Sequence, residues 1–365
     1  MIPVFSLTPA EREDFAAKLL AWFAKAMRPL PWRETYDPYS VWVSEIMLQQ
    51  TQMERGVRYF NDWMRTFPDI ASVAGASEEN VMRAWEGLGY YSRARNLHAA
   101  AKRVMDEHGG VFPDTLEAIR ALPGVGEYTA GAIASIAFNQ PVPAVDANVT
   151  RIFARICDID VPVTSSGVKE FITGAVASLM PEDSPRLFIQ ALMELGALVC
   201  GKNPDCGVCP LEEYCEARRL GSVAERPKKK AKTVYTSLEM STGVVLRNGE
   251  VFIQKRPPYG VWAGLWEFPG GCLEEGETPE QALVREVMEE TEMAVTAGDK
   301  IAVVKHSYTT CRVTMHGYFC ELTDKDPALV LHAATEGRWV RPEETAEYAF
   351  PAGHRKLLEI LGWGR

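Results

Sequence analysis

Residues 122–126 read Leu-Pro-Gly-Val-Gly, and they lie between two segments whose apolar residues recur at helical spacing. The segment that follows carries apolar residues at Ala130, Ile133 and Ile136. Two glycines separated by one residue allow backbone conformations that other residues avoid, and they expose successive amides at the start of the next helix. Such a loop can bind a phosphate without a basic side chain, although a plain helix–helix turn is the commoner explanation. The stretch predicts two helices joined by a tight hairpin.

The rest of residues 1–221 continues this helical pattern. Apolar residues recur at helical spacing in Phe15, Leu19 and Phe23, and pairs of glycine and proline separate segments of short-helix length. Residues 222–236 are basic and contain proline, which is typical of a linker. We therefore predict an all-α domain over residues 1–221 and a linker over 222–236.

From residue 237 onward the apolar period changes to that of strands. Asn248-Gly249 is a typical hairpin turn, and it separates the apolar runs 243–246 and 251–253. Further strands are predicted at 300–306, 313–322 and 337–340, and helices at 279–292 and 354–361. The predicted fold is multidomain, with an α+β domain over 237–365 after the all-α domain.

The charge of the chain is acidic, with 39 Lys and Arg against 49 Asp and Glu and a net charge of −10. Residues 1–221 and 237–365 each carry −7, whereas the linker carries +4 and contains Arg226-Pro-Lys-Lys-Lys-Ala-Lys232. A broad basic face is excluded. Any contact with nucleic acid must therefore use local features such as backbone amides and helix N-termini.

Composition and the N-terminal sequence also indicate the kind of protein and where in the cell it is expected. Hydrophobic residues make up 47% of the 365 residues, which is enough for two cores and excludes a predominantly disordered chain. The N-terminal residues lack the apolar region of a signal peptide, and no stretch approaches the roughly 20 apolar residues of a membrane span. We expect a cytoplasmic protein with no membrane partner.

Four of the eight cysteines lie within 16 residues, at Cys200, Cys206, Cys209 and Cys215. A cluster of this density in a cytoplasmic chain indicates metal binding and not disulfides. Four thiolates can hold either one tetrahedral zinc ion or a 4Fe–4S cluster, and the spacing alone does not separate the two. The other cysteines are predicted to be ordinary buried residues.

Two carboxylates have unusual surroundings. Glu45 lies inside the apolar stretch Val41–Leu48, which leaves little polar face, so burial is expected to raise its pKa toward the range of a general acid. Asp146 follows an apolar run and precedes a predicted helix, and its ordinary role there is that of an N-cap. A protonated carboxyl paired with an ionised carboxylate is the combination that glycosidic bond cleavage requires.

Taken together, these motifs resemble the helix-hairpin-helix DNA glycosylases that carry a cysteine-bound iron–sulfur cluster, and within them the adenine DNA glycosylase (MutY) family. The resemblance covers nearly all of residues 1–220. It rests on four motifs in the same order as in the family: Trp42-Val-Ser-Glu-Ile-Met-Leu-Gln-Gln-Thr51, Trp85-Glu-Gly-Leu-Gly-Tyr-Tyr-Ser92, Leu122–Thr129 and Val145-Asp-Ala-Asn148.

The resemblance implies an activity and its catalytic residues. The substrate is duplex DNA in which adenine is mispaired with 8-oxoguanine or guanine, and the adenine must leave the stack to react. Glu45 protonates the base, Asp146 stabilises the positive charge on the sugar, and Tyr128 and Asn148 orient these two carboxylates. The related endonuclease III family has a catalytic lysine shortly after the hairpin, where this chain has Glu127-Tyr128-Thr129. A monofunctional glycosylase is therefore implied.

The resemblance also implies DNA contacts. The hairpin of Gly124, Val125 and Gly126 grips a backbone phosphate, while Gln50 and Tyr90 enter the base stack around the mispair. For Tyr90 the alternative is core packing. In the basic linker, we expect Lys228, Lys229 and Lys230 to add sequence-independent affinity for DNA.

For the cysteines, the resemblance favours a 4Fe–4S cluster over zinc, bound by the loop at 200–215. The family usually has six residues between its first two cysteines, whereas this chain has five, Gly201–Asp205. A shortening by one residue is expected to be absorbed by the loop.

Residues 237–365 resemble the Nudix-like C-terminal domain of the same family, which reads 8-oxoguanine. The family's Phe-Ser-His stretch corresponds here to His306-Ser-Tyr308-Thr309-Thr310, so His306, Tyr308 and Thr309 are the candidates for lesion recognition. The chain also carries nearly the whole Nudix box, with Glu292 in place of the final glycine. Glu286, Glu289 and Glu290 then share one helical face that can bind Mg²⁺. We favour a solvated acidic face without a functional metal.

Other functions fit parts of the sequence. The chain is expected to act as a monomer, and its main alternative is a bifunctional protein whose Nudix box also hydrolyses nucleotide pyrophosphates. An endonuclease III-like glycosylase and an iron–sulfur DNA-binding protein without activity are two further alternatives. The joint presence of Glu45, Asp146, Tyr128 and Asn148 argues against the last.

Overall fold

The structure is a computed structural model, and it describes residues 5–228, 236–308, 310–324 and 327–363. The chain folds into two compact units. The first unit comprises Met1–Gly75 and Asn96–Lys232, and the second comprises Ala76–Arg95 and Thr233–Arg365. The second unit thus includes a segment that lies inside the predicted all-α domain. The domain boundaries at 221 and 237 remain a prediction.

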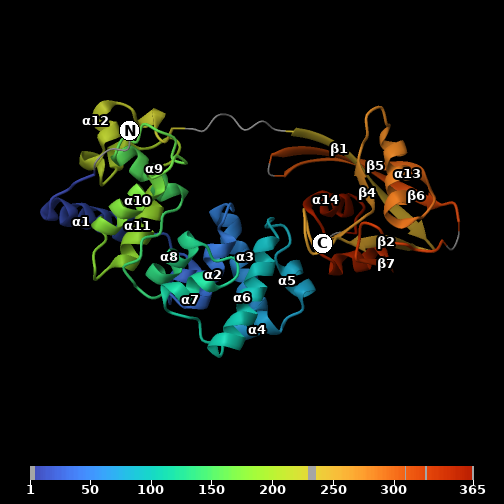
Figure 1. Ribbon diagram of the computed structural model, residues 1–365, viewed down its shortest axis with the longest axis horizontal. Helices are drawn as coiled ribbons and strands as arrows, with labels where there is room; N and C mark the ends of the chain where they lie inside the picture. The colour runs from blue at the N-terminus through green and yellow to red at the C-terminus, as the bar shows by residue number, and fades with distance from the viewer. Residues whose placement is uncertain (1–4, 229–235, 309, 325–326, 364–365) are drawn as a thin grey trace. The chain divides into compact units, whose positions relative to one another are not determined.

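The first unit is helical, as predicted (Figure 1). Its α-helices are α1 (Pro9–Ala26), α2 (Pro38–Met47), α3 (Met53–Thr66), α4 (Ile70–Gly75), most of α6 (Ser92–His108), α7 (Leu116–Ala121), α8 (Glu127–Ile136), α9 (Ala147–Ile156), α10 (Val168–Leu179), α11 (Pro185–Leu198) and α12 (Glu216–Leu220). Short 3-10 turns lie at η1 (Pro31–Arg33), η2 (Cys206–Val208), η3 (Glu212–Tyr214) and η4 (Val223–Glu225).

These helices begin where the sequence supplies caps. Thr8 and Glu11 form a capping box at the start of α1, and the Asp37 carboxylate accepts the Ser40 amide at the start of α2. The apolar faces meet in a core that contains Phe15, Leu19 and many other buried side chains. The hairpin between α7 and α8 has the predicted geometry, with Gly124 at a φ of 75°. A Cβ on Gly124 would lie 2.6 Å from Asn96 Cβ, so both the conformation and the packing require glycine.

The second unit contains α5 (Glu78–Ala84), the first residues of α6, and a mixed sheet with two further helices (Figure 1). Its later elements are β1 (Thr236–Arg247), β2 (Glu250–Lys255), β3 (Trp266–Glu267), β4 (Gly270–Cys272), α13 (Pro279–Thr291), β5 (Val295–Tyr308), β6 (Cys311–Leu322), β7 (Glu336–Val340), η5 (Pro342–Glu347) and α14 (Ala352–Ile360). The described strands run in the order β3-β2-β1-β6-β5, while β4 pairs with β1 and β7 pairs with β2.

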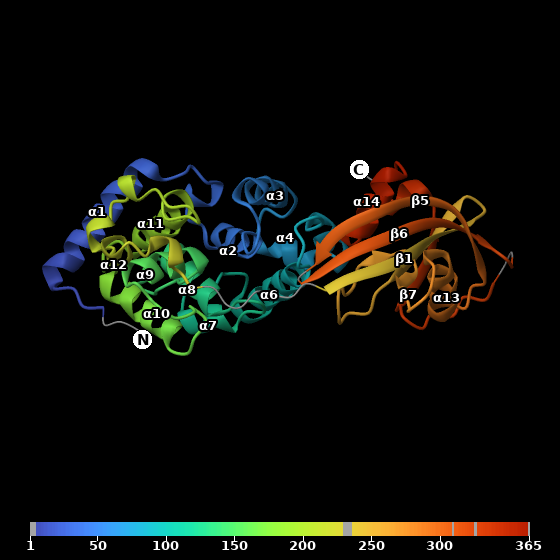
Figure 2. The ribbon, with the colours of Figure 1, turned by 90° about the horizontal axis from the view of Figure 1, so that it is seen from above.

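Most strand pairs are antiparallel, but β1 and β6 pair in parallel over eleven positions, from Thr236↔Cys311 to Leu246↔Glu321. The sheet has a core on each face, since adjacent residues of β1 point to opposite sides. Val244 packs with Leu357 of α14, and Val245 packs with Leu283 of α13. Figure 2 shows α14 and α13 on opposite faces of these strands. The α+β character predicted for this part of the chain is confirmed.

Within the described part of the chain, none of the helices has both the length and the apolar character needed to cross a membrane.

Candidate active site

Glu45 lies on α2, and the structure buries it as its apolar neighbours predicted. Its side chain is 8% exposed, and Tyr128 at the start of α8 donates a hydrogen bond of 2.8 Å to its Oε2 atom. Burial raises the pKa of Glu45 to about 7, while the hydrogen bond from Tyr128 opposes this rise. A carboxyl group with this pKa is partly protonated at neutral pH, which is the requirement for a general acid.

Asp146 is the N-cap of α9, as its sequence context suggested, and it also lines the same cavity as Glu45. The Val149 amide donates to its Oδ1 atom at 2.7 Å, and the Asn148 side-chain amide donates to its Oδ2 atom at 2.8 Å. Burial raises the pKa of Asp146, but these two donors oppose the rise because they stabilise the ionised form. Burial thus raises the pKa of both carboxyls, but two donors oppose the rise at Asp146, whereas the Tyr128 hydroxyl opposes it at Glu45.

Asn148 is itself held in place by Arg151. The Arg151 guanidinium donates to Asn148 Oδ1, to the Gly196 carbonyl and to the Cys200 carbonyl, each at 2.7 Å. Helix α11 approaches closely at this point, since a Cβ on Gly196 would lie 2.5 Å from the Asn148 Cβ. The orientation of the Asp146 carboxylate thus depends on Asn148, Arg151 and the absence of a side chain at Gly196.

The cavity that holds these groups has a volume of about 770 Å³. It brings together Glu45, Tyr128, Asp146 and Asn148, the four residues that the sequence singled out as catalytic. Its wall also includes Gln50, which is exposed and adopts a left-handed conformation with a φ of 57°. The predicted catalytic residues and one predicted DNA contact therefore share one cavity.

Sequence reasoning missed a charged cluster in the wall of this cavity. Glu194 of α11 is 1% exposed, and its carboxylate pairs with Arg28 at 2.6 Å and with Arg33. Both arginines lie in the segment between α1 and α2, next to the buried Trp32. A glutamate among apolar helix residues was the available signal, as it was for Glu45.

The hairpin residues present their backbone to solvent. Gly124 and Gly126 are exposed and Val125 is buried, so the Val125 side chain anchors the loop. Gly126 is the N-cap of α8, and as a glycine it has no side chain to accept hydrogen bonds from the first amides of the helix. The first backbone amides of α8 therefore point out of the N-terminal end of the helix, where an anion binds favourably.

The four clustered cysteines line a second, small cavity. Cys200 follows α11, Cys206 is the first residue of η2, Cys209 directly follows η2, and Cys215 is the N-cap of α12. Burial and the neighbouring thiolates raise the pKa of Cys209 to about 11. Arg155 donates to the Cys200 Sγ atom at 3.2 Å. Among the described residues, no three His, Cys, Asp or Glu side chains are arranged to hold a single metal ion.

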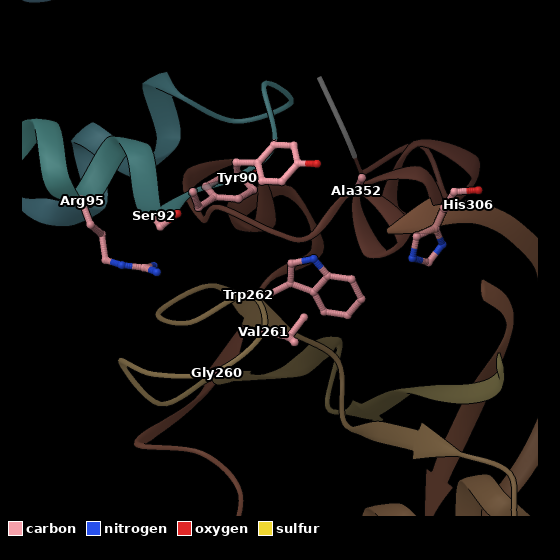
Figure 3. Close-up of a pocket in the computed structure, with 11 residues that line it drawn as sticks. Tyr90, Ser92, Arg95, Gly260, Val261, Trp262, His306 and Ala352 are labelled. Atoms are coloured by element: carbon pink, nitrogen blue, oxygen red, sulfur yellow. The ribbon is translucent and has the colours of Figure 1, made fainter. Parts of the chain in front are cut away.

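Tyr90 and His306 lie around a further cavity of about 260 Å³ within the second unit (Figure 3). Tyr90 is 48% exposed, so its core-packing alternative is wrong. It has a φ of 48°, which is rare for an aromatic residue. Trp262, which the sequence did not indicate, lies beside His306 with ring centroids 6.0 Å apart. Thr309 and the side chain of Tyr308 lie outside the described residues.

The acidic residues of the Nudix box have internal partners. Arg285 pairs with Glu277 at 2.8 Å, with Glu286 at 3.0 Å and with Glu289 at 3.3 Å. Glu290 accepts hydrogen bonds from the Gly270 amide and the Gln254 side chain. Burial, with Glu267 nearby, raises the pKa of Glu290 to about 7. Each of the three candidate ligands for Mg²⁺ is thus already bonded to another group of the protein.

In the linker, only the first of the three predicted lysines lies within the described residues. Lys228 pairs with Asp160 at 2.6 Å. Lys229 and Lys230 lie outside the described residues.

Comparisons with known proteins agree with this arrangement. Residues 43–172 match the family model of the HhH-GPD superfamily base excision DNA repair proteins, and residues 241–360 match that of the NUDIX domain. The human adenine DNA glycosylase is 33% identical over 96% of this chain and 74% of its own length. The adenine DNA glycosylase of Mycobacterium tuberculosis strain H37Rv is 42% identical over 56% of this chain and 67% of its own length.

Solved structures extend the likeness to the helical fold. A thermostable thymine-DNA glycosylase has a TM-score of 0.52 at 25% identity, covering 58% of this chain and 98% of its own. An endonuclease III in a non-covalent DNA complex has a TM-score of 0.51 at 21% identity, which shows the fold alone; it covers 61% of this chain and 100% of its own. The helix-hairpin-helix core and the Nudix-like domain predicted from the sequence are confirmed. This chain belongs to the adenine DNA glycosylase family.

Proposed function

We propose that this chain excises adenine mispaired with 8-oxoguanine or guanine in duplex DNA, by hydrolysis of the N-glycosidic bond. The observation that carries the proposal is that Glu45 and Asp146 line one cavity, where Asp146 accepts hydrogen bonds from two amide groups and Glu45 accepts one from Tyr128. Family membership supports adenine as the base that is removed. Because a base in a duplex is covered by its neighbours, the adenine must turn out of the stack to enter the cavity.

In the reaction, Glu45 donates a proton to N7 of the adenine. Protonation makes the base a better leaving group, so the bond between C1′ and N9 breaks and its electron pair stays with the base. A group with a pKa of about 7 supplies this proton at neutral pH and can receive another from water afterwards.

Asp146 acts on the sugar. When the base departs, positive charge develops at C1′ and the ring oxygen, and an ionised carboxylate stabilises it, through space or by a transient bond. The Val149 amide and the Asn148 side-chain amide stabilise the ionised form of this carboxylate and fix its orientation. Water then adds at C1′, which leaves an abasic site in the strand.

The wall of the cavity suits a purine with a hydrogen-bonding edge. Glu194 offers carboxylate oxygens as acceptors, and Arg28 and Arg33 offer guanidinium donors. Adenine carries an amino donor beside a ring-nitrogen acceptor, and both kinds of group find a counterpart here. We propose that this cluster contributes to base selection.

We further propose that the enzyme is monofunctional and works as a monomer. A lyase step requires an amine that forms a Schiff base with C1′. None of the described residues that line the cavity is a lysine.

The remaining assignments concern DNA and the cluster. We propose that the Gly124–Gly126 amides bind a phosphate and that Gln50 and Tyr90 enter the base stack around the mispair. We also propose that residues 237–365, with His306 and Tyr308, recognise the base opposite the adenine.

We further propose that the four cysteines hold a 4Fe–4S cluster. Their donor set fits, because four half-buried thiols share one cavity beside the Arg155 cation. Bound there, the cluster would hold the 200–215 loop together.

One assay tests the proposed function. Duplexes that hold one central A·8-oxoguanine, A·G or T·8-oxoguanine pair are incubated with the protein and then treated with alkali. Strand breaks confined to the adenine-containing strand support the proposal. Breaks in the T·8-oxoguanine duplex, which has no adenine at the mispair, contradict it. Trapping with borohydride should yield no covalent DNA adduct, since a Schiff base is not formed.

A further inference from the structure

The segment that carries Tyr90 is bonded to residues near the C-terminus of the chain. Glu86 accepts hydrogen bonds at its Oε1 atom from Arg355 Nε at 2.7 Å and from the Phe350 amide at 3.1 Å. The side chains of Glu86 and Arg355 are only 16% and 14% exposed, so the ion pair is largely shielded from water. Such a salt bridge fixes the relative position of its two side chains, because a charge shielded from water is costly unless its partner stays close.

Two more bonds attach the same segment on the other side of Tyr90. The Tyr91 hydroxyl donates to the Phe350 carbonyl at 3.2 Å, and Arg95 donates to the Ala263 carbonyl. Residues on both sides of Tyr90 are therefore fixed to a part of the chain more than 160 positions away. These bonds explain why Ala76–Arg95 belongs to the second unit.

The Tyr90 backbone needs such support. Its φ of 48° is unfavourable for a residue with a bulky side chain, so the conformation persists only where the surroundings impose it. Arg93 contributes locally, since it donates to the Leu88 and Gly89 carbonyls at 3.1 and 3.0 Å. Its guanidinium also lies 5.7 Å from the centroid of the Tyr90 ring.

We propose that Glu86 and Arg355 are a positioning pair that sets the place of Tyr90 during adenine release. This inference rests on the proposed function, in which Tyr90 enters the stack beside the mispair. Tyr90, Trp262 and His306 border one cavity (Figure 3), so a displacement of the Tyr90 segment also changes the shape of this cavity. The C-terminal residues therefore act on catalysis through Tyr90, without contact with the adenine.

The test is a double-mutant cycle on the full-length protein. Glu86→Gln keeps an acceptor for the Phe350 amide but removes the charge, and it should slow single-turnover adenine release from an A·8-oxoguanine duplex by about tenfold. In a Tyr90→Ala background the same substitution should have no further effect. Additive losses in the double variant would show a general structural role and overturn the inference.

Controls separate folding from positioning. Arg341→Gln removes an exposed ion pair with Glu344 in the same unit, and it should leave the rate unchanged. Thermal unfolding of each variant is measured; if Glu86→Gln unfolds, Arg355→Lys, which keeps the charge, is used in the same cycle. Absence of adenine release by the wild type overturns the proposed function instead. Release that is unaffected by Tyr90→Ala leaves that function standing and overturns only this inference.

Discussion

A carboxyl group becomes a useful acid when its surroundings disfavour its charge, and Glu45 and Asp146 show this at the scale of single residues. Glu45 is buried and Asp146 is half-buried in one cavity, and the loss of water raises both pKa values. Asp146 receives an amide and a side-chain donor that stabilise its charge, whereas Glu45 receives only the Tyr128 hydroxyl among the described side-chain hydrogen bonds. This difference supports our proposal that Glu45 carries the proton and Asp146 the charge.

Glu45→Gln and Asp146→Asn should each abolish adenine release while mispaired duplex still binds. Both carboxyls act on charge that develops in the transition state, so the ground-state complex loses little. Single-turnover rates should fall by at least about 10³-fold for Glu45→Gln, within the range of general acid catalysis. Excision by Glu45→Gln at the wild-type rate would remove the general acid from the mechanism.

The pH dependence of the reaction should report the Glu45 pKa. Glu45 must be protonated to act, so the single-turnover rate should fall as the pH rises through about 7. The Tyr128 hydroxyl stabilises the ionised form and lowers this pKa. Tyr128→Phe should therefore raise the pKa and move the fall in rate to higher pH, as measured in a pH–rate profile. A shift to lower pH would contradict this account of the hydrogen bond.

Single residues also show where sequence reasoning succeeds. The burial of Glu45 was predictable because its apolar neighbours leave the helix little polar face. Glu194 sits in an equally apolar helix but was missed, since its partners Arg28 and Arg33 are more than 160 positions away. Pairing between distant charges leaves no trace in local periodicity.

At the scale of elements, the cysteine loop decides between two metals. Purified protein should be brown, with an iron content that approaches four atoms per chain. Cys206→Ala should lower both the intensity of the brown colour and the iron content. Four thiols around a shared cavity are the structural reason. Metal analysis of anaerobically prepared protein checks this, and a colourless protein with one zinc per chain would establish the four-thiolate zinc site instead.

Helix α13 bears on whether the Nudix box is active. Its acids already pair with Arg285, Gln254 and the Gly270 amide, so a metal must displace these partners. Glu292 has a φ of 56° where the box has glycine, and it pairs with His332 at 2.8 Å. Full-length protein with Mg²⁺ should release no phosphate or pyrophosphate from 8-oxo-dGTP or nucleotide sugars. Release that disappears in Glu289→Gln would make the protein bifunctional.

The elements of the second unit were predictable to different degrees. The hairpin at Asn248-Gly249 was evident, because both residues adopt the positive φ angles that such a turn requires. The parallel pairing of β1 with β6 was not, since several other elements separate the two strands along the chain. Strand order is determined by packing on both faces, which a local pattern does not encode.

At the scale of the whole molecule, the linker should supply affinity without selectivity. Replacing Lys228, Lys229 and Lys230 with glutamine should reduce the salt dependence of DNA binding by up to about three counterions. Lys228 already pairs with Asp160, so its share should be the smallest. Binding titrations over a range of salt measure the slope, and the preference for the mispair should stay constant. An unchanged slope would make the linker a tether only.

The division of the chain was the least predictable feature. Composition and periodicity change near residue 222, and they indicate a boundary there. They cannot show that Ala76–Arg95 joins the second unit, because Phe350, the partner of Glu86 and Tyr91, is far away along the chain. Hydrogen bonds across more than 250 positions determine that grouping, and only the folded chain displays them.

The pairing of Glu86 with Arg355 has a consequence for exchange between relatives. A chimera that takes its C-terminal part from another family member, joined in the linker, would set Glu86, Tyr91 and Arg95 against foreign partners. The unit that must be exchanged as a whole is discontinuous in sequence, because it comprises both residues 76–95 and residues 233–365. Recombination at a single crossover therefore breaks this unit, whereas an exchange with three crossovers preserves it.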